Sequence, residues 1–229
     1  KKFNHEDEIY DWYKSKKIAQ ILVNEKNDDE SLKYIEKKIK NLKKTSVKIT
    51  YDLANIYKKF KKYKKAIEYY SITLSKLDNN SSAYAEVLYR RGGIYERIKD
   101  YKKSDLDLLD SLKIRPDDPY TLNYLAYSWL ERNHNIKKAI EMLELAYSMK
   151  KNDPYITDTV GWGYYLIGDY STAEKYLKKA VQLMPYDPIV HDHYGDVLWQ
   201  LDKKIQAKYF WESVLELEDA DEEMKKDIK

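Results

Sequence analysis

Small residues recur along the chain at a spacing near 34 positions. Gly161 lies 34 positions before Gly195, and Gly92 lies 34 positions before Ala126. A second small residue follows each of them about twelve positions later, as Ala173 follows Gly161. The other pairs of this kind are Gly195/Ala207, Gly92/Ser104, Ala126/Ala139, Ala54/Ala66 and Ala19/Ser31. A repeat of this length, in a chain with few Gly and Pro, predicts tandem pairs of helices.

Each repeat also places a large apolar side chain on the face that its small residue defines. Three positions after the first small residue stand Tyr57, Tyr95, Trp129, Tyr164 and Leu198. Residues i and i+3 share one face of a helix, so we expect this face to be packed. Short polar turns separate the two helices of a pair, at Phe60–Tyr63, Ile98–Tyr101, Ile167–Tyr170 and Leu201–Lys204.

Local signals mark where these helices begin and end. Asp153 and Asp187 each precede a proline, which predicts an aspartate N-cap with Pro at the first helical position. Gly168 is expected to end a helix, because glycine adopts positive φ at little cost. A glycine inside a helix costs roughly 1 kcal/mol relative to alanine. Gly161 and Gly195 therefore need a packing reason, and we expect two helices to cross closely there.

The composition excludes several kinds of site. The chain has 229 residues, of which 35% are charged and 14% aromatic, and it has no cysteine. A disulfide, a thiolate zinc site and a cysteine nucleophile are thus excluded. The absence of cysteine fits either a reducing or an oxidising compartment. No run of 18 or more apolar residues is present, so no membrane span is expected. The chain begins without Met and still reads as helix at its end, so we expect a piece of a longer protein.

These spacings resemble those of the tetratricopeptide repeat (TPR) family. That family has a small residue, Tyr three positions later, Ala twelve later, an aromatic residue or Leu sixteen later, and Pro twenty-four later. Residues 154–187 match this pattern at Gly161, Tyr164, Ala173, Leu177, Ala180 and Pro185. The resemblance implies an all-α, right-handed solenoid of about six helix pairs, concave on the side of the first helices.

The same pattern divides the chain. Residues 1–46 are expected to be a degenerate repeat or N-terminal capping helices, and 47–221 a TPR solenoid, with the start of a capping helix at 222–229. The repeats of the solenoid are expected at residues 47–80, 85–118, 119–153, 154–187 and 188–221.

In this family, ligand-facing residues occupy fixed positions on the first helix of each pair. The corresponding residues here are Tyr89, Asn123, Tyr127, Asp158, Trp162, Tyr165, Asp192, Asp196 and Trp199. Rigid aromatic side chains are typical of binding hot spots, which favours a protein or peptide partner. The alternative is that each aromatic side chain packs on the neighbouring repeat.

The partner of this groove is expected to be basic or neutral. Family members that hold a peptide's C-terminal carboxylate use Lys and Asn at these positions. This chain keeps Asn123 but has Asp158, Asp192 and Asp196, and so departs from that subtype.

Metal, catalytic and nucleic-acid sites are not expected. His191 and His193 lie two positions apart, so on a helix they point about 200° apart and cannot share one ion. His193 and Asp196 could share one only weakly. No Gly-rich loop or nucleophile elbow is present, so we expect neither an enzyme nor a cofactor. The basic stretch Lys58–Lys65 spans a predicted turn, so its lysines should point in several directions, unlike a nucleic-acid patch.

The charges are distributed unevenly. Basic residues outnumber acidic ones in residues 1–80, whereas acidic residues outnumber basic ones in residues 187–229. Such a dipole could orient a partner or favour self-association with another copy. The alternative is that these side chains are simply solvated.

Residues 123–127, 158–162 and 192–199 resemble more closely the C-terminal half of long bacterial TPR lipoproteins. Some of these are outer-membrane adaptors that bind a carboxy-terminal processing protease and deliver cell-wall hydrolases to it. The resemblance implies a periplasmic scaffold in the bacterial cell envelope, with the cytoplasm as the alternative location. A different hypothesis makes the chain the substrate-recognition or regulatory region of a larger enzyme.

Overall fold

Pairs of helices joined by short turns form the described part of the chain, which in this computed structural model comprises residues 10–18, 28–40, 45–217, 219–220 and 225–226. The chain divides into two compact units, Lys1–Ile114 (unit 1) and Arg115–Lys229 (unit 2). Across these residues the secondary structure is helical, so the predicted all-α fold of helix pairs is confirmed. Ala19 and most of the predicted capping segment 222–229 lie outside the described residues.

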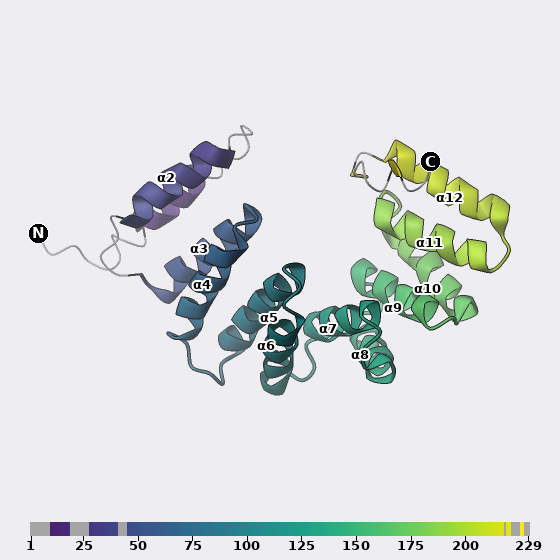
Figure 1. Ribbon diagram of the computed structural model, residues 1–229, viewed down its shortest axis with the longest axis horizontal. Helices are drawn as coiled ribbons and strands as arrows, with labels where there is room; N and C mark the ends of the chain where they lie inside the picture. The colour runs from purple at the N-terminus through teal and green to yellow at the C-terminus, as the bar shows by residue number, and fades with distance from the viewer. Residues whose placement is uncertain (1–9, 19–27, 41–44, 218, 221–224, 227–229) are drawn as a thin grey trace, which may run out of the picture. The chain divides into compact units, whose positions relative to one another are not determined.

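Unit 1 contains two stacked helix pairs and a preceding helical part. Residues 10–18 are helical, and the helices that follow are α2 (Asp28–Lys40), α3 (Val47–Lys59), α4 (Tyr63–Leu74), α5 (Ser82–Arg97) and α6 (Tyr101–Ile114). Helix α3 packs against α4 and α5 against α6, while α4 contacts α5 (Figure 1). The buried Trp12 donates a hydrogen bond from its indole to Asp52 Oδ2 at 3.0 Å, which ties the first helical segment to α3.

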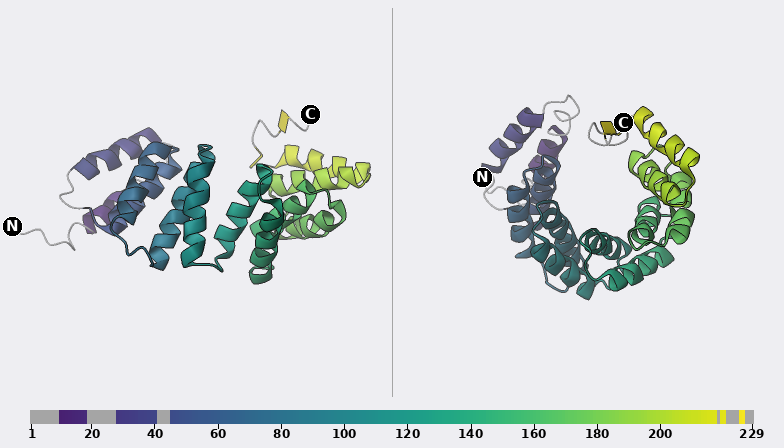
Figure 2. Two further views of the ribbon diagram at one scale, coloured as in Figure 1. Left: turned by 60° about the horizontal axis from the view of Figure 1, so that its bottom comes forward. Right: turned by 45° about the vertical axis from the view of Figure 1, so that its right-hand side comes forward.

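Unit 2 contains three helix pairs in series. Its helices are α7 (Pro119–Glu131), α8 (Ile136–Met149), α9 (Pro154–Leu166), α10 (Tyr170–Leu183), α11 (Pro188–Gln200) and α12 (Lys204–Glu216). Each first helix packs against its own second helix, and α8 contacts α9 as α10 contacts α11 (Figure 2). The first helices also touch one another, α7 with α9 and α9 with α11. Side chains on the first helices of successive repeats can therefore form one shared surface.

The recurring spacing of small residues places them where two helices cross. A Cβ added at Gly161 would lie 2.6 Å from Leu177 Cγ, and one at Gly195 would lie 2.5 Å from Trp211 Nε1. Ala173 and Ala207, twelve positions on, are fully buried. The predicted close crossing at the two glycines is confirmed, and it explains why glycine is tolerated inside these helices.

The first helices of unit 2 begin as the sequence indicates. Asp153 Oδ1 accepts a hydrogen bond from the Ile156 N–H at 3.1 Å, and Asp187 Oδ1 accepts one from the Val190 N–H at 3.2 Å. Asp118 caps α7 in the same way, with its Oδ2 accepting from the Thr121 N–H at 2.9 Å. Each cap satisfies a backbone donor that the helix itself leaves unpaired.

The turn inside each pair follows one backbone pattern. Gly168 has φ +84°, and two bonds close the end of α9: its N–H donates to Tyr165 O, and the Asp169 N–H donates to Tyr164 O. This is a Schellman motif, which confirms Gly168 as a helix terminator. The equivalent positive-φ residues of the other pairs are Lys61, Lys99, Asn133 and Asp202. Only one of the five turns thus has the residue that this conformation favours.

Candidate functional site

Five of the expected groove residues come together on two neighbouring helices. Asp158, Trp162 and Tyr165 lie on α9 at positions i, i+4 and i+7, and so share one face. Asp192 and Asp196 lie on α11 at i and i+4. Because α9 and α11 touch, these two faces adjoin. All five side chains are partly buried.

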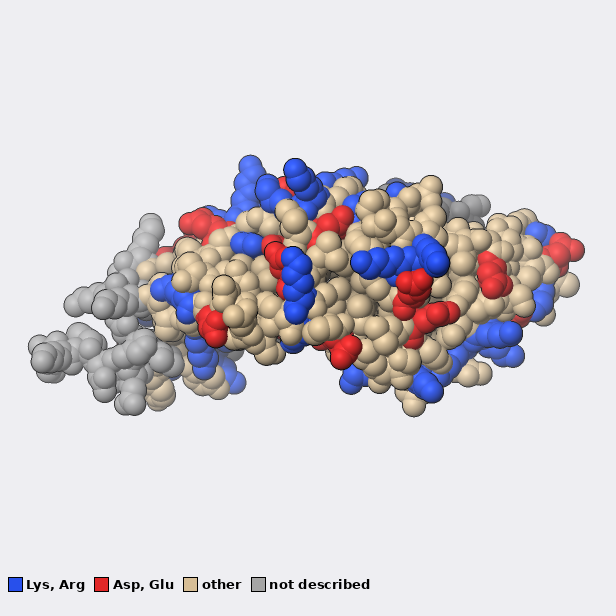
Figure 3. Space-filling view, turned by 90° about the horizontal axis from the view of Figure 1, so that it is seen from below, with Lys and Arg blue, Asp and Glu red and all other residues tan. Residues whose placement is uncertain are grey.

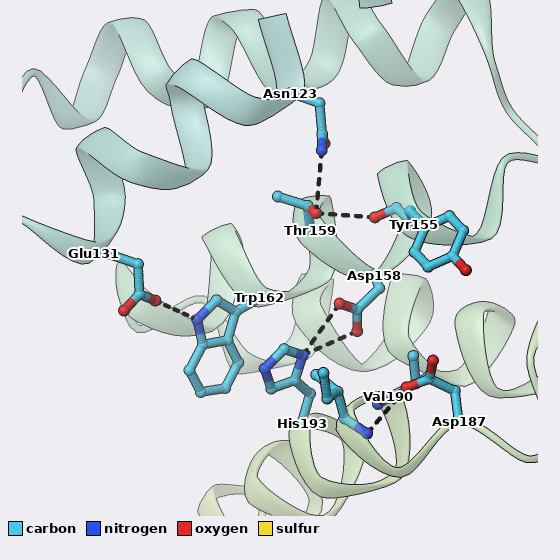
Figure 4. A network of polar contacts seen from close by, with 10 residues as sticks. Asn123, Glu131, Tyr155, Asp158, Thr159, Trp162, Asp187, Val190 and His193 are labelled. Atoms are coloured by element: carbon cyan, nitrogen blue, oxygen red, sulfur yellow. Dashed lines mark hydrogen bonds and ion pairs between the residues drawn. The ribbon is translucent and has the colours of Figure 1, made fainter. Parts of the chain in front are cut away.

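Trp162 is the centre of this group. Its indole stacks on Tyr165, with ring centroids 4.5 Å apart, and on the imidazole of His193, with centroids 4.1 Å apart. Its Nε1 donates a hydrogen bond to Glu131 Oε1 of α7 at 2.8 Å. Figure 4 shows the indole between Glu131 and His193. Trp162 therefore packs on the next repeat, the alternative considered for each aromatic residue, and joins three successive first helices.

His193 bonds the acidic residue that precedes Trp162 by one turn. Its Nδ1 lies 3.0 Å from Asp158 Oδ1 and 3.2 Å from Oδ2 (Figure 4). The groove positions predicted from the sequence include neither His193 nor Glu131. The sequence signal that could identify His193 is its position on α11, the first helix of the following repeat, one residue after the groove position Asp192.

The carboxylates around His193 perturb its acid–base chemistry. Burial would lower the pKa of His193, but the charges of Asp158, Asp192 and Asp196 outweigh it, so the pKa is raised above its usual value. Burial raises the pKa of Asp196 to about 6, assisted by repulsion from Asp192, while His193 and a hydrogen bond from Trp211 act in the opposite direction. Burial also raises the pKa of Tyr165, with Asp196 adding to it. Asp196 thus keeps its proton to a higher pH than an ordinary aspartate, and His193 keeps its positive charge to a higher pH than an ordinary histidine.

Asn123 of α7 connects to the same surface through a threonine. Its Nδ2 donates to Thr159 Oγ1 at 3.4 Å, and the Thr159 hydroxyl donates to Tyr155 O at 2.9 Å (Figure 4). Among the described residues, the buried Asn123 Oδ1 finds no hydrogen-bond partner. Asn123 therefore links α7 to α9 through its Nδ2, while its Oδ1 is left as a hydrogen-bond acceptor.

Two further expected residues expose aromatic surface. Tyr127 on α7 is 36% exposed and Trp199 at the end of α11 is 38% exposed. The Lys204 ammonium lies 3.8 Å from the centroid of the Trp199 ring, and Trp211 lies beside that ring at 5.3 Å. The Trp199 ring thus makes a cation–π contact within the chain. Tyr89, the remaining expected residue, lies on α5 of unit 1 and is partly buried.

The two histidines of α11 face different partners. His191 Nδ1 lies 2.7 Å from Ser213 Oγ and its ring packs edge-on against Phe210, whereas His193 faces α9. Within the described ranges, no group of three His, Asp or Glu side chains has the arrangement of a metal site. None of the described helices has the length and hydropathy needed to cross a bilayer.

The basic stretch Lys58–Lys65 spans a turn, as predicted. Lys59 ends α3, Lys61 occupies the positive-φ position, and Tyr63 begins α4. Lys65 forms an ion pair with Glu36 at 2.5 Å and lies over the ring of Tyr57. Figure 3 shows basic and acidic side chains interspersed on the face in view.

Comparisons of sequence place the chain among repeat proteins. A family profile described as "Tetratricopeptide repeat" matches residues 47–71 and 85–118. A TPR repeat-containing protein of Pseudomonas aeruginosa is 31% identical over 110 residues. That match covers 48% of this chain and 18% of the relative, so the chain corresponds to a small part of that protein's length.

Solved structures share the fold. MamA residues 41-end from Desulfovibrio magneticus align with a TM-score of 0.63 at 20% identity, covering 77% of this chain and 97% of theirs. A tetratricopeptide repeat protein from Parabacteroides merdae aligns at 0.68 and 14% identity, covering 90% and 79%. PilW, a type IV pilus biogenesis factor, aligns at 0.65 and 19% identity, covering 74% and 76%.

Proposed function

Because the chain is a tetratricopeptide-repeat protein, we propose that it is an interaction scaffold that holds a segment of a partner protein against unit 2. The binding surface is the groove face of unit 2, defined as Asn123, Tyr127, Asp158, Trp162, Tyr165, Asp192, Asp196 and Trp199. The observation that carries the proposal is the series of partly exposed aromatic side chains beside carboxylates on first helices that touch one another.

Rigidity suits this surface for binding. The Trp162 indole is held by Glu131, Tyr165 and His193, so the neighbouring Tyr165 ring is ordered before a partner arrives. Binding costs less when side chains are already immobilised, because each flexible side chain ordered on binding costs about 0.5–1.5 kcal/mol. In this arrangement Trp162 organises the groove face, while Tyr127, Tyr165 and Trp199 offer contact area.

The carboxylates set the character of the partner. Asp192 and Asp196 lie on the same helix face, and both act on Tyr165 of the adjoining helix. An acidic segment would meet like charge here, and placing like charges opposite one another in an interface costs several kcal/mol. The groove face therefore suits a basic or neutral segment.

We extend the proposal to a setting in the bacterial cell envelope, where the chain would serve as an adaptor for a carboxy-terminal processing protease. The similarity of residues 158–162 and 192–199 to envelope TPR lipoproteins supports this setting. Fractionation of cells producing the tagged natural protein tests the location, and co-purification with the protease tests the role. Recovery from the cytoplasm alone would contradict the setting.

The groove face is tested with aromatic variants on and off it. The on-face double variant is Tyr127→Ala with Trp199→Ala. The matched control is Tyr186→Ala with Tyr209→Ala, which removes two tyrosines that are 79% and 67% exposed elsewhere in unit 2. A partner captured from extracts with the wild-type chain is purified, and its Kd is measured calorimetrically with all three proteins.

We expect the on-face variant to weaken binding at least tenfold, because truncating an aromatic hot-spot residue typically costs about 2 kcal/mol or more. The control should bind like wild type, and circular dichroism should show equal helicity. Equal loss in both variants, or in neither, would move the partner site off the groove face. A partner identified as a catalytic domain encoded in the same longer chain would favour the larger-enzyme hypothesis.

A further inference from the structure

We propose that unit 1 carries a second interaction surface, which takes a short segment of a protein with acidic side chains. This basic face of unit 1 is formed by Tyr51 and Lys58 of α3 and by Arg90 and Arg97 of α5. None of these residues is among the groove positions predicted from the sequence. The inference goes beyond the proposed function, which concerns unit 2 and a basic or neutral segment.

The basic face begins where a side chain of α5 lies against α3. The guanidinium carbon of Arg90 lies 5.8 Å from the centroid of the Tyr51 ring, and its Nε donates to Glu86 Oε1 at 2.7 Å. Among the described residues no other acceptor bonds this guanidinium, and the Arg90 side chain is 35% exposed. Arg90 is thus held in place while its terminal N–H groups are left for an incoming group.

Lys58 and Arg97 lie two helical turns further along the same helices. Lys58 follows Tyr51 by seven positions on α3, and Arg97 follows Arg90 by seven positions on α5. Residues seven positions apart share one face of a helix and are about 10 Å apart along its axis. Helices α3 and α5 run in the same direction, because α4 packs against both and returns between them. The contact between Arg90 and Tyr51 therefore implies that Lys58 and Arg97 adjoin as well.

The electrostatics of Lys58 agree with this placement. Burial lowers the pKa of the half-buried Lys58 ammonium, and the positive charges of Arg90 and Arg97 lower it further, while Glu86 acts in the opposite direction. Neither Lys58 nor Arg97 forms an ion pair within the described residues. A carboxylate placed between these cations would offset their mutual repulsion, so the face favours an anionic group from outside.

The dipole of a helix is an alternative reason for basic residues near its C-terminal end. Lys59, an exposed residue that ends α3, is accounted for in this way alone. The dipole does not explain why Arg90, in the middle of α5, lies over a ring of α3. It also does not explain why Lys58 is half-buried beside two guanidinium groups. The arrangement of these cations across two helices therefore indicates a binding surface.

The size of the basic face suits a peptide carboxylate better than a nucleic acid. Its cations span about two helical turns, roughly 10 Å, and a guanidinium binds a carboxylate through paired N–H groups. Nucleic acids are usually bound through a longer series of phosphates. The other lysines of the stretch Lys58–Lys65 do not extend the face: Lys61 lies in the turn, for example, and Lys65 pairs with Glu36. One or two acidic side chains of an extended segment thus match it.

The test uses the whole chain and peptides whose ends are acetylated and amidated, so that side chains alone carry charge. A peptide of alternating Glu and Ser is compared by calorimetry with its Gln counterpart and with a single-stranded oligothymidylate of the same net charge. We expect the Glu peptide to bind, and to lose affinity several-fold when salt is raised, because salt screens exposed charges. The Gln peptide should not bind.

A pair of double variants locates the site. Lys58→Gln with Arg97→Gln should weaken binding of the Glu peptide about five- to tenfold, because two partly exposed ion pairs are lost. The matched control is Lys64→Gln with Lys102→Gln, which removes the same charge from exposed side chains of the second helices α4 and α6. It should bind like wild type. Circular dichroism confirms that both variants are folded.

Equal affinity of the two double variants for the Glu peptide would place the site off the basic face. A wild-type chain that does not bind the Glu peptide would overturn the inference altogether. Tighter binding of the oligothymidylate, lost with Lys58→Gln and Arg97→Gln, would replace the acidic segment by a nucleic acid.

The aromatic double variant of unit 2, Tyr127→Ala with Trp199→Ala, separates this inference from the proposed function. It should bind the Glu peptide like wild type while it loses the captured partner. Loss of the captured partner alone supports the groove face of unit 2, and loss of the Glu peptide with that variant would contradict a separate surface on unit 1.

Discussion

The imidazole of His193 lies on the indole of Trp162, with centroids 4.1 Å apart and planes 15° apart, and thereby links two repeats. The same imidazole bonds Asp158 of the preceding repeat. In a solenoid each repeat is stabilised mainly by its neighbours. A side chain that bonds and stacks across a repeat boundary should therefore contribute to the stability of unit 2 as well as to its groove face.

Replacing His193 by alanine should lower the stability of unit 2 by about 2 kcal/mol, because it removes a hydrogen bond to a partly buried carboxylate. His193→Asn, whose amide N–H can take the place of Nδ1, should lose less. Urea unfolding followed by tryptophan fluorescence measures both, since all tryptophans except Trp12 lie in unit 2. Equal unfolding midpoints for alanine and wild type would mean that the contact does not stabilise the repeat boundary.

Substituting alanine for the glycines at the helix crossings should change the stability of the protein by different amounts. At Gly161 the added Cβ meets Leu177 Cγ at 2.6 Å and the Leu177 backbone nitrogen at 3.1 Å, so Gly161→Ala should destabilise by about 1–3 kcal/mol. At Gly92 the nearest atom is Leu108 Cγ at 3.0 Å. There the gain of roughly 1 kcal/mol in helix propensity should offset much of the crowding. Thermal unfolding of the two variants checks this order, and a more stable Gly161→Ala protein would contradict the close crossing.

Much of this framework could be predicted from the sequence, because it depends on local spacing. The caps at Asp153 and Asp187, the terminator Gly168 and the crossings at Gly161 and Gly195 each follow from a residue type at a fixed place in the repeat. The contact between His193 and Trp162 could not be predicted in this way. It depends on how far α11 is shifted along α9, and the period of the repeat does not encode that shift.

The turns inside the helix pairs offer a way to stabilise the chain. Lys99 has φ +62°, a left-handed conformation that costs a side-chain-bearing residue roughly 1–2 kcal/mol. Lys99→Gly should therefore raise stability, while Gly168→Ala should lower it by a similar amount. Differential scanning calorimetry compares both with wild type. Opposite shifts in Tm are expected, and shifts of the same sign would contradict the shared backbone pattern of the turns.

Asp196 should make unit 2 more stable in mild acid than at neutral pH. Its folded pKa of about 6 lies above its ordinary value of 3.8, so its contribution is complete below pH 3.8 and is lost as the pH rises through about 6. Asp196→Asn, which has no charge to bury, should thus raise the urea midpoint at pH 7.5 and have little advantage at pH 4. Comparing the urea midpoints of the variant and wild type at each pH separates the contribution of Asp196 from that of other titrating groups, such as His191. A variant less stable than wild type at pH 7.5 would contradict the buried carboxylate.

Hydrogen exchange in the presence of a bound segment tests the groove face of unit 2 most directly. The captured partner is added at saturation, and amide protection is mapped along the chain. Increased protection concentrated in α9 and α11, and lost with the Tyr127→Ala and Trp199→Ala double variant, is the predicted result. Protection confined to the second helices α10 and α12, or to unit 1, would contradict binding on the groove face.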